Sequence, residues 1–295
     1  MTRTYSTGSF AAVVAAGGRE RYMNLGRAAG GRHESTRRRQ TRMAQSIAEV
    51  VAPQDGDAIL DIGCGRGGML ALLADEAPGA RLTGVNVDPI QLQAARRMLG
   101  TQRSVRLLQA DARELPFARA DFDTAYAVEL LSHLDHKQSF YQELARVIRP
   151  GGRAVLAVIT LVRPFVDSPP ADQAHLRRLG AFFAEDSSGI PTAADLLEGL
   201  AAAGLTPIAD VDLTSAVFPA RQETFIRINR HLGHHSRWHR RAARAYVRRA
   251  WGVEPDELHE FIGANLTADP CRLYEYHLFS ARKANDRSSD VDVAA

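Results

Sequence analysis

The sequence predicts an α/β fold with a doubly wound, mainly parallel seven-stranded sheet and helices on both of its faces. Two observations carry this prediction. Short apolar runs typical of strands alternate with longer segments of helical periodicity from residue 58 onward. The apolar runs are nearly continuous, which indicates strands that are covered on both sides. Because such sheets bind ligands beyond the carboxyl ends of their strands, functional residues are expected there.

Seven apolar runs are predicted to be strands, and a helix is expected between most of them. The expected strands cover residues 58–63, 81–87, 104–111, 122–130, 151–160, 205–214 and 272–283. The expected helices cover residues 36–52, 67–77, 89–99, 137–148, 192–204, 220–250 and 255–266. Pro89 suits the first turn of its helix, and Pro150-Gly151-Gly152 is expected to form a turn.

The composition is that of an ordinary globular chain, with 45% hydrophobic and 24% charged residues. No apolar run approaches the roughly 20 residues that a membrane span needs, and no secretory signal is expected. The two cysteines, Cys64 and Cys271, exclude a disulfide framework and favour a cytoplasmic location. The net charge of +3 does not by itself predict a nucleic-acid partner.

A glycine-rich turn follows the first expected strand, in the stretch DIGCGRGG. Gly63-x-Gly65-x-x-Gly68 formally satisfies the dinucleotide-binding pattern, whereas the lack of Gly-Lys-Ser/Thr excludes a nucleoside triphosphate P-loop. Asp61, just before the turn, would repel a pyrophosphate resting on the helix N-terminus. The same carboxylate suits a ligand that carries a cationic amino-acid group.

The turn resembles motif I, D-x-G-x-G-x-G, of the class I (Rossmann-like) methyltransferases that use S-adenosylmethionine (SAM). The matching residues are Asp61, Gly63, Gly65 and Gly67, with Cys64 inside the turn. SAM carries an ammonium and a sulfonium but no phosphate. The resemblance therefore implies SAM as cofactor, bound by these five residues. Further likenesses point to bacterial natural-product O- and C-methyltransferases and to sterol-type methyltransferases.

Two later motifs resemble those with which this family binds the rest of SAM. In TGVNVDPIQ, Asn86 stands where the family usually has an acid against the ribose, with Asp88 and Gln91 beside it. In QADARELPF, the resemblance implies that Asp111 takes the adenine amino group and the Ala112 backbone a ring nitrogen. The alternative roles are capping of the next helix for Asn86 and Asp88, and a turn for Asp111.

A segment before the glycine turn, RYMNLGRAAGG, resembles the family's aromatic-x-N-x-G segment that folds over the cofactor. The resemblance implies that Tyr22 lines the methyl site. The aromatic pair that usually follows the family's glycine is absent here, since Gly26 is followed by Arg27 and Ala28.

The fourth expected strand ends in AVELLSHLDH, which places Glu129 and His133 at the carboxyl edge of the sheet. This segment resembles natural-product methyltransferases that read E-x-x-x-H there. The resemblance implies that His133 is a general base for O-methylation, since an imidazole can take a hydroxyl proton at neutral pH. In C-methylation, Glu129 would instead steady a cationic intermediate. A histidine that only caps or packs near Asp135 is the alternative.

The expected helix 220–250 is unusually basic, with six arginines in its second half. Histidines recur at i, i+4 spacing, at His231, His235 and His239, but no acidic residue accompanies them, so no metal is predicted. The arginines and Trp238 together would suit an anionic substrate or nucleic acid. A solvated or oligomer-facing helix is the favoured alternative.

The sequence thus predicts a cytoplasmic SAM-dependent methyltransferase that O-methylates, or alternatively C-methylates, a small molecule in bacterial secondary metabolism. We expect an N-terminal helical segment over the cofactor (1–52), a SAM-binding core (53–160), a region of pocket helices and closing strands (161–283) that begins with an inserted helical cap (161–190), and a disordered tail (284–295).

The expected partner is a small-molecule substrate. Neither nucleic acid nor a membrane is expected to bind, and the sequence leaves open whether the chain forms a homo-oligomer. Three alternatives remain: an RNA methyltransferase, a non-catalytic SAM-binding protein, and an NAD-dependent oxidoreductase that uses the literal G-x-G-x-x-G match.

Overall fold

The computed structural model describes residues 21–29, 34–100, 105–183, 187–251, 254–265 and 269–285. These residues form a seven-stranded sheet with the strand order β3-β2-β1-β4-β5-β7-β6. Its strands are β1 (Ala58–Ile62), β2 (Arg81–Asn86), β3 (Val105–Gln109), β4 (Phe122–Val128), β5 (Ile148–Leu161), β6 (Leu205–Asp212) and β7 (Tyr274–Lys283). Strand β7 is antiparallel to β5 and β6, and all other pairs are parallel. The predicted α/β fold is therefore confirmed.

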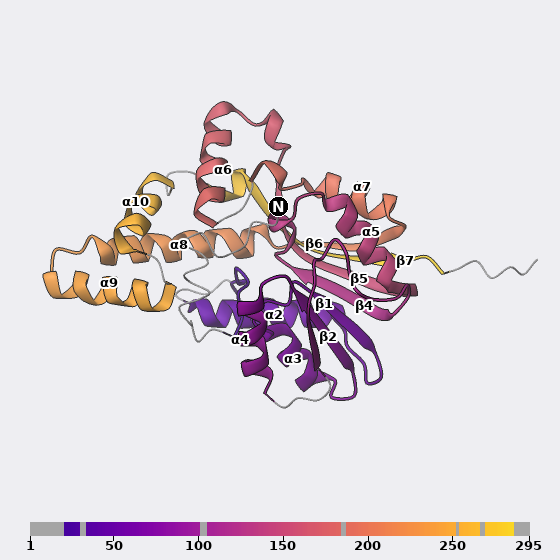
Figure 1. Cartoon of the computed structure of the whole chain (residues 1–295). Coiled ribbons are helices and arrows are strands. Elements are labelled where there is room, and N and C mark those ends of the chain that lie inside the picture. Colours follow the sequence, from indigo (N-terminus) through magenta and orange to yellow (C-terminus); the bar gives the residue numbers. More distant parts are fainter. Residues whose placement is uncertain are drawn as a thin grey trace, which may run out of the picture.

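Helices cover both faces of the sheet (Figure 1). One face carries α2 (Thr36–Val51), α3 (Gly68–Glu76) and α4 (Pro89–Leu99), whose apolar residues share one buried cluster. The other face carries α5 (Lys137–Val147) and α7 (Ala193–Ala202), which pack in a second cluster. Strand β1 lies between the clusters and is buried along its whole length, as its unbroken apolar run predicts.

Polar side chains fix where several helices begin. The Ser35 hydroxyl accepts a hydrogen bond from the Arg38 amide at the start of α2. Asp88 accepts one from the Ile90 amide at the start of α4, where Pro89 occupies the first turn. Each of these bonds satisfies an amide that a helix leaves without an internal partner.

The remaining helices lie beyond the carboxyl ends of the parallel strands or project sideways (Figure 1). They are α6 (Pro170–Phe183), α8 (Thr214–Leu232), α9 (Arg237–Trp251) and α10 (Pro255–Asn265), with short 3-10 turns at Leu131–His133, Phe165–Asp167, Ser187–Gly189 and Pro270–Arg272. Helix α6 belongs to the predicted cap. The residues Leu161, Phe165, Leu176, Ile190 and Leu273 form a small apolar cluster of their own beneath it.

Two local predictions are wrong. The basic stretch 220–250 is not one helix, because α8 ends at Leu232 and α9 begins only at Arg237. Gly233 follows the last residue of α8, and its amide donates to the Asn229 carbonyl of the last turn. Pro150-Gly151-Gly152 does not form a separate turn but lies inside β5, at an irregularity in its pairing with β4. Gly151 has a φ of 74°, a backbone conformation that suits such an irregularity.

None of the helices among the described residues combines the length and the apolar character needed to cross a bilayer. The divisions predicted at residues 52, 160 and 283 stay predictions. Residues 1–20 of the N-terminal segment and 286–295 of the expected tail lie outside the described residues.

Candidate functional site

The glycine turn adopts a backbone that only glycine takes without strain. Gly63, Gly65 and Gly67 have φ values of 82°, 51° and 79°. The amides of Gly63 and Cys64 both donate to the Val85 carbonyl at 2.9 Å, which ties the turn to the end of β2. Cys64 is buried, and burial raises the pKa of its thiol. The turn therefore presents a fixed backbone surface at the carboxyl edge of β1, at the start of α3.

Asp61 lies beneath this turn with only 3% of its surface exposed. Its Oδ2 accepts a hydrogen bond of 2.8 Å from the Tyr126 hydroxyl on β4. Burial raises the pKa of Asp61 to about 7, and the bond from Tyr126 partly offsets that rise. Among the residues that the structure describes, no arginine, lysine or histidine forms an ion pair with it. A buried carboxylate without a cation fits a ligand that brings one, as the ammonium or sulfonium of SAM would.

Residues 21–29, here called the strap, cross the glycine turn. A methyl group added at Gly68 would lie 2.0 Å from the Arg21 carbonyl oxygen, and one added at Gly65 would lie 3.6 Å from Met23 Sδ. Tyr22 is buried in the apolar cluster of α2 and α3. The strap thus lies against the glycine turn, and the role of Tyr22 at the methyl site stays a prediction.

Several hydrogen bonds hold the strap to the core. Asn24 and Gln40 bind each other's backbone carbonyls through their side-chain amides, at 3.2 and 3.0 Å. The Arg27 amide donates to the Arg39 carbonyl at 3.0 Å. The Leu25 amide donates to Glu129 Oε1 at 2.8 Å. The side-chain oxygen of Asn24 is buried and has no hydrogen-bond partner, so the strap holds one unsatisfied polar acceptor.

Glu129 connects the strap to the last strand. Its Oε1 also accepts a hydrogen bond of 2.9 Å from the hydroxyl of Tyr276 on β7. Glu129 has a φ of 52°, a left-handed conformation that a residue other than glycine seldom adopts. Tyr276 is fully buried, and burial together with Glu129 raises the pKa of its hydroxyl. The carboxylate predicted to be catalytic is therefore engaged in holding the strap.

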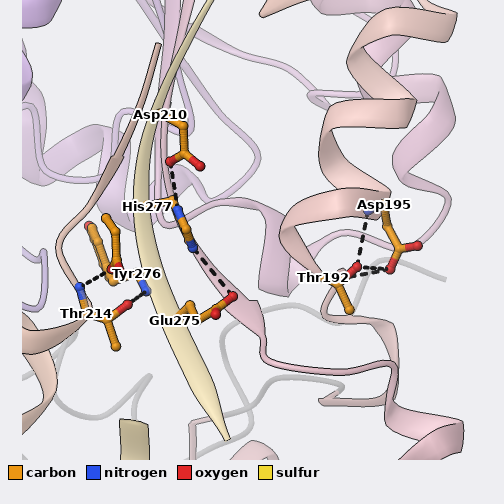
Figure 2. A network of polar contacts seen from close by, with 8 residues as sticks. Thr192, Asp195, Asp210, Thr214, Glu275, Tyr276 and His277 are labelled. Atoms are coloured by element: carbon orange, nitrogen blue, oxygen red, sulfur yellow. Dashed lines mark hydrogen bonds and ion pairs between the residues drawn. The ribbon is translucent and has the colours of Figure 1, made fainter. Parts of the chain in front are cut away.

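The backbone at Tyr276 is fixed from the neighbouring helix. The Tyr276 amide donates to Thr214 Oγ1 at 3.0 Å, and the Leu213 amide donates to the Tyr276 carbonyl at 2.8 Å. Figure 2 shows Tyr276 and the next residue, His277, pointing to opposite sides of β7. His277 Nδ1 lies 2.7 Å from Asp210 on the edge strand, and Nε2 lies 3.5 Å from Glu275. These contacts fix the position of β7 beside Glu129, to which the Tyr276 hydroxyl donates.

The residues predicted to contact the ribose are close together but bound to one another. Asn86 donates to Gln91 Oε1 at 3.1 Å and accepts from the Asp88 amide at 3.0 Å. Asp88 caps α4, which is the alternative role foreseen for it. Asn86 and Gln91 are buried beside the glycine turn, since a methyl group at Gly65 would lie 3.5 Å from Gln91 Oε1.

Asp111 forms an ion pair that the sequence reading did not foresee. Its two oxygens accept from the Arg113 amide and Nε at 2.9 and 3.0 Å, and from Nη2 at 2.7 Å. The Arg113 guanidinium holds the pKa of that carboxyl below its usual range. Ala112, between them, is buried. A contact from Asp111 to an adenine amino group would share these oxygens with Arg113.

His133 ends the 3-10 turn after β4, where its amide donates to the Leu130 carbonyl at 3.0 Å. Its side chain is half-buried. Burial, and next the charge of Lys137, lower the pKa of His133 to about 4. The imidazole is therefore neutral at pH 7 and able to accept a proton, but it is a weaker base than an ordinary histidine.

The basic region does not present the expected row of histidines on one helix. His231 lies on α8 and His239 on α9, so the i, i+4 interpretation is wrong. Their ring nitrogens lie 2.8 Å apart, and the His234 ring stacks on those of His235 and His239. No group of three or more His, Cys, Asp or Glu side chains suited to a metal ion occurs among the residues that the structure describes.

Sequence reasoning missed Tyr126, Tyr276 and Arg113. Tyr126 and Tyr276 lie within apolar strand runs, where a tyrosine is typical of the core. The sequence does not reveal which group a buried tyrosine hydroxyl will bind. For Arg113, the nearest available signal was its position two residues after Asp111, a spacing at which an aspartate side chain often accepts from a backbone amide in a turn.

Alanine at Gly68 is expected to weaken SAM binding, because its methyl group overlaps the Arg21 carbonyl of the strap. Calorimetric titration measures the affinity for SAM, and the rate of tryptic cleavage after Arg21 measures how far the strap is displaced. Gly233→Ala is the matched control, since its nearest neighbour would lie 3.5 Å away and its φ is −86°. If Gly68→Ala bound SAM as the wild type does, the strap would not cover the cofactor.

The chain matches a known family over part of its length. Residues 60–156 match the family described as "Methyltransferase domain". An O-methyltransferase of Penicillium expansum is 37% identical over 131 residues, which cover 43% of this chain and 47% of that protein. The chain spans about half the length of the curated relatives it matches.

Solved structures match over nearly the whole chain. The [4+2]-cyclase SpnF has a TM-score of 0.69 and 21% identity, and the match covers 96% of this chain and 97% of the cyclase. A geranyl diphosphate methyltransferase in complex with GPP and sinefungin has a TM-score of 0.66 and 21% identity, over 89% and 90% of the two chains. At this level of identity, the likeness establishes the fold.

Proposed function

We propose that the chain, whose residues 60–156 match the family described as "Methyltransferase domain", is a class I SAM-dependent methyltransferase that transfers the methyl group of SAM to a small-molecule acceptor. The observation that carries the proposal is the buried Asp61 carboxylate, which has no cationic partner among the described residues and lies under a glycine turn that the strap crosses. Fold alone does not support an activity, because a [4+2]-cyclase has the same fold.

The cofactor would be held by the residues that the sequence singled out. Asp61 would pair with the cationic amino-acid end, and the backbone of Gly63, Cys64, Gly65 and Gly67 would line it. The ribose would lie against Asn86 and Gln91, with Asp88 beside them, the adenine against Asp111 and Ala112, and the strap with Tyr22 over the whole. SAM, when bound, supplies an electrophilic methyl group on its sulfonium sulfur. The strap would exclude water from the site, so that the acceptor and not water reacts with that methyl group.

O-methylation is the first reaction we propose, with His133 as the group that takes the acceptor's hydroxyl proton. A neutral imidazole at the carboxyl edge of β4 supports this role. The O-methyltransferase among the relatives supports the same reaction class. We place this reaction in bacterial secondary metabolism, because the motifs of the chain resemble those of bacterial natural-product methyltransferases.

C-methylation is the second candidate, and one observation favours it. A pKa of about 4 makes His133 a poor base for a phenol or an alcohol, whereas methylation of an alkene needs no base at the start. In that reaction, the negative charge of Glu129 would stabilise the cation that methyl addition produces.

Methyl-labelled SAM, incubated with hydroxylated aromatic and isoprenoid acceptors, tests the proposed function. A labelled product is expected, and NMR of that product assigns the methyl group to oxygen or carbon. If SAM binds but no acceptor is ever methylated, while one of them is rearranged, the chain is not a methyltransferase.

The pH dependence of turnover separates the two reactions. If His133 is the base, kcat/KM is expected to stay level from pH 7 down to about 5 and to fall near its pKa of about 4. His133→Asn would then lower kcat roughly 100-fold or more with unchanged SAM affinity. His136→Asn, on an exposed neighbour, is the control. Full turnover in His133→Asn would exclude the base and favour C-methylation.

A further inference from the structure

Helix α9 is the outermost of the helices that project from the sheet (Figure 1), and it packs against α8 and α10. Val247 is buried on its inner side. On the flank, Arg244 pairs with Asp256, and Arg248 with Glu254. These contacts fix which side of α9 faces inward, and therefore which side faces solvent.

The α9 outer face, as we call it, is opposite Val247. Residues at helical spacing fall on one stripe there: Trp238, Arg241, Ala242, Ala245 and Tyr246. Trp238 is 79% exposed and Tyr246 is 59% exposed, which is unusual for two large aromatic rings on one short helix. Ala242 and Ala245 lie between the two rings on this stripe, together with the exposed Arg241.

Positive charge accompanies the aromatic rings. Arg237 and Arg241 are exposed beside Trp238, and neither forms an ion pair with an acidic side chain of the described residues. α9 itself contains no acidic residue. The pairs at Asp256 and Glu254 neutralise only the arginines on the flank. Arg237 and Arg241 therefore leave uncompensated positive charge beside Trp238.

We propose that the α9 outer face docks on an anionic lipid bilayer. Tryptophan and tyrosine rings suit the headgroup level of a membrane, and an amphipathic helix with arginines beside them lies in that interface. The exposed arginines complement the negative surface of such a bilayer. Because α9 is outermost, the bilayer reaches this face without meeting the sheet.

A single-stranded nucleic acid fits the same face less well. Trp238 and Tyr246 are eight residues apart, which is about 12 Å along a helix. This distance is too long for the two rings to stack on neighbouring bases, the contact on which sequence-tolerant binding depends. A second copy of the chain fits less well too, because it would bring arginine against arginine.

This inference departs from the expectation that no membrane is involved. The sequence pattern placed the aromatic residues in a basic helix but did not show that they lie on its solvent side. The inference does not rest on the proposed function, since lipid binding is measured without turnover.

Flotation of the full chain with lipid vesicles tests the proposed membrane docking. Vesicles of phosphatidylcholine alone are compared with vesicles that also contain 30% phosphatidylglycerol. Binding to the anionic vesicles is expected, with weakening as the salt concentration rises. The double variant Arg237→Gln/Arg241→Gln is expected to bind roughly 30-fold more weakly, about fivefold for each arginine at the surface. Trp238→Ala/Tyr246→Ala is expected to lose binding that persists at high salt.

The matched control is Arg96→Gln/Arg97→Gln, which removes two exposed arginines from α4. It should bind the vesicles as the wild type does, and all variants should keep the wild-type affinity for SAM. Three results would each overturn the proposal: no binding to anionic vesicles, equal losses in the control, or salt-sensitive binding of single-stranded RNA without vesicle binding.

Discussion

Replacing Asp61 by asparagine is expected to weaken SAM binding by roughly 30-fold or more, because it removes the buried charge that would pair with the cofactor's cation. The variant keeps a side-chain oxygen for the Tyr126 hydroxyl, so the core is disturbed little. Calorimetric titration with SAM measures the effect. Asp121→Asn, which removes an exposed carboxylate, is expected to bind SAM normally.

The pH dependence of the same titration gives a sharper test. Because the pKa of Asp61 is raised to about 7, SAM binding has to displace a proton below that pH. The apparent Kd of the wild type is therefore expected to rise about tenfold for each pH unit below 7, and that of Asp61→Asn to stay level. A level wild-type profile, or an asparagine variant of unchanged affinity, would show that Asp61 does not meet the cation.

The free energy of unfolding of the cofactor-free protein should also change with pH, because Asp61 ionises in this range. A carboxyl whose pKa is raised on folding stabilises the fold fully below about pH 4, and this contribution is lost as the pH rises to about 7. Above pH 7, Asp61→Asn without SAM is therefore expected to unfold at a higher denaturant concentration than the wild type.

Replacing Glu129 by glutamine is expected to weaken SAM binding by roughly tenfold to 100-fold, because the strap loses its charged hydrogen-bond acceptor. Tyr276→Phe should act in the same direction, since it removes the other donor to that oxygen. Both variants are expected to be cleaved faster by trypsin in the strap. Tyr141→Phe, at a buried tyrosine on the opposite face of the sheet, is the control.

Turnover at saturating SAM distinguishes positioning from chemistry at Glu129. If the carboxylate only holds the strap, kcat recovers once SAM is saturating, in both Glu129→Gln and Tyr276→Phe. If it also stabilises a cationic intermediate, kcat stays low in Glu129→Gln and recovers in Tyr276→Phe. Wild-type SAM affinity in both variants would contradict the role of the strap contact.

The sheet was predictable because its signals are local. The buried run at 58–62 and the glycines after it can be read from neighbouring residues, and the structure places them as expected. The division of 220–250 into two helices was not, because Gly233 is a modest break within a strongly helical pattern. Helix ends of this kind are decided by packing, which a single sequence does not display.

The candidate site was predictable only in part, for a similar reason. Asp61 and Glu129 were found because they lie at the carboxyl ends of apolar strands, within motifs that resemble known ones, but their partners come from far away in the chain. Tyr126 lies 65 residues from Asp61, and Tyr276 lies 147 residues from Glu129. Pairings across such distances depend on the strand order of the sheet, which short motifs do not encode.

The pairing of β7 between β5 and β6 has a consequence for how the protein acquires its binding site. Leu25, Glu129 and Tyr276 are joined by contacts that span 104 and 147 residues. Contacts of such long sequence separation form late in folding, because the chain must first close large loops. During synthesis, the motif-bearing strands emerge well before Tyr276 does. The contacts that hold the strap through Glu129 are therefore complete only after β7 has entered the sheet. The protein is thus expected to retain its cofactor only once the whole fold has formed.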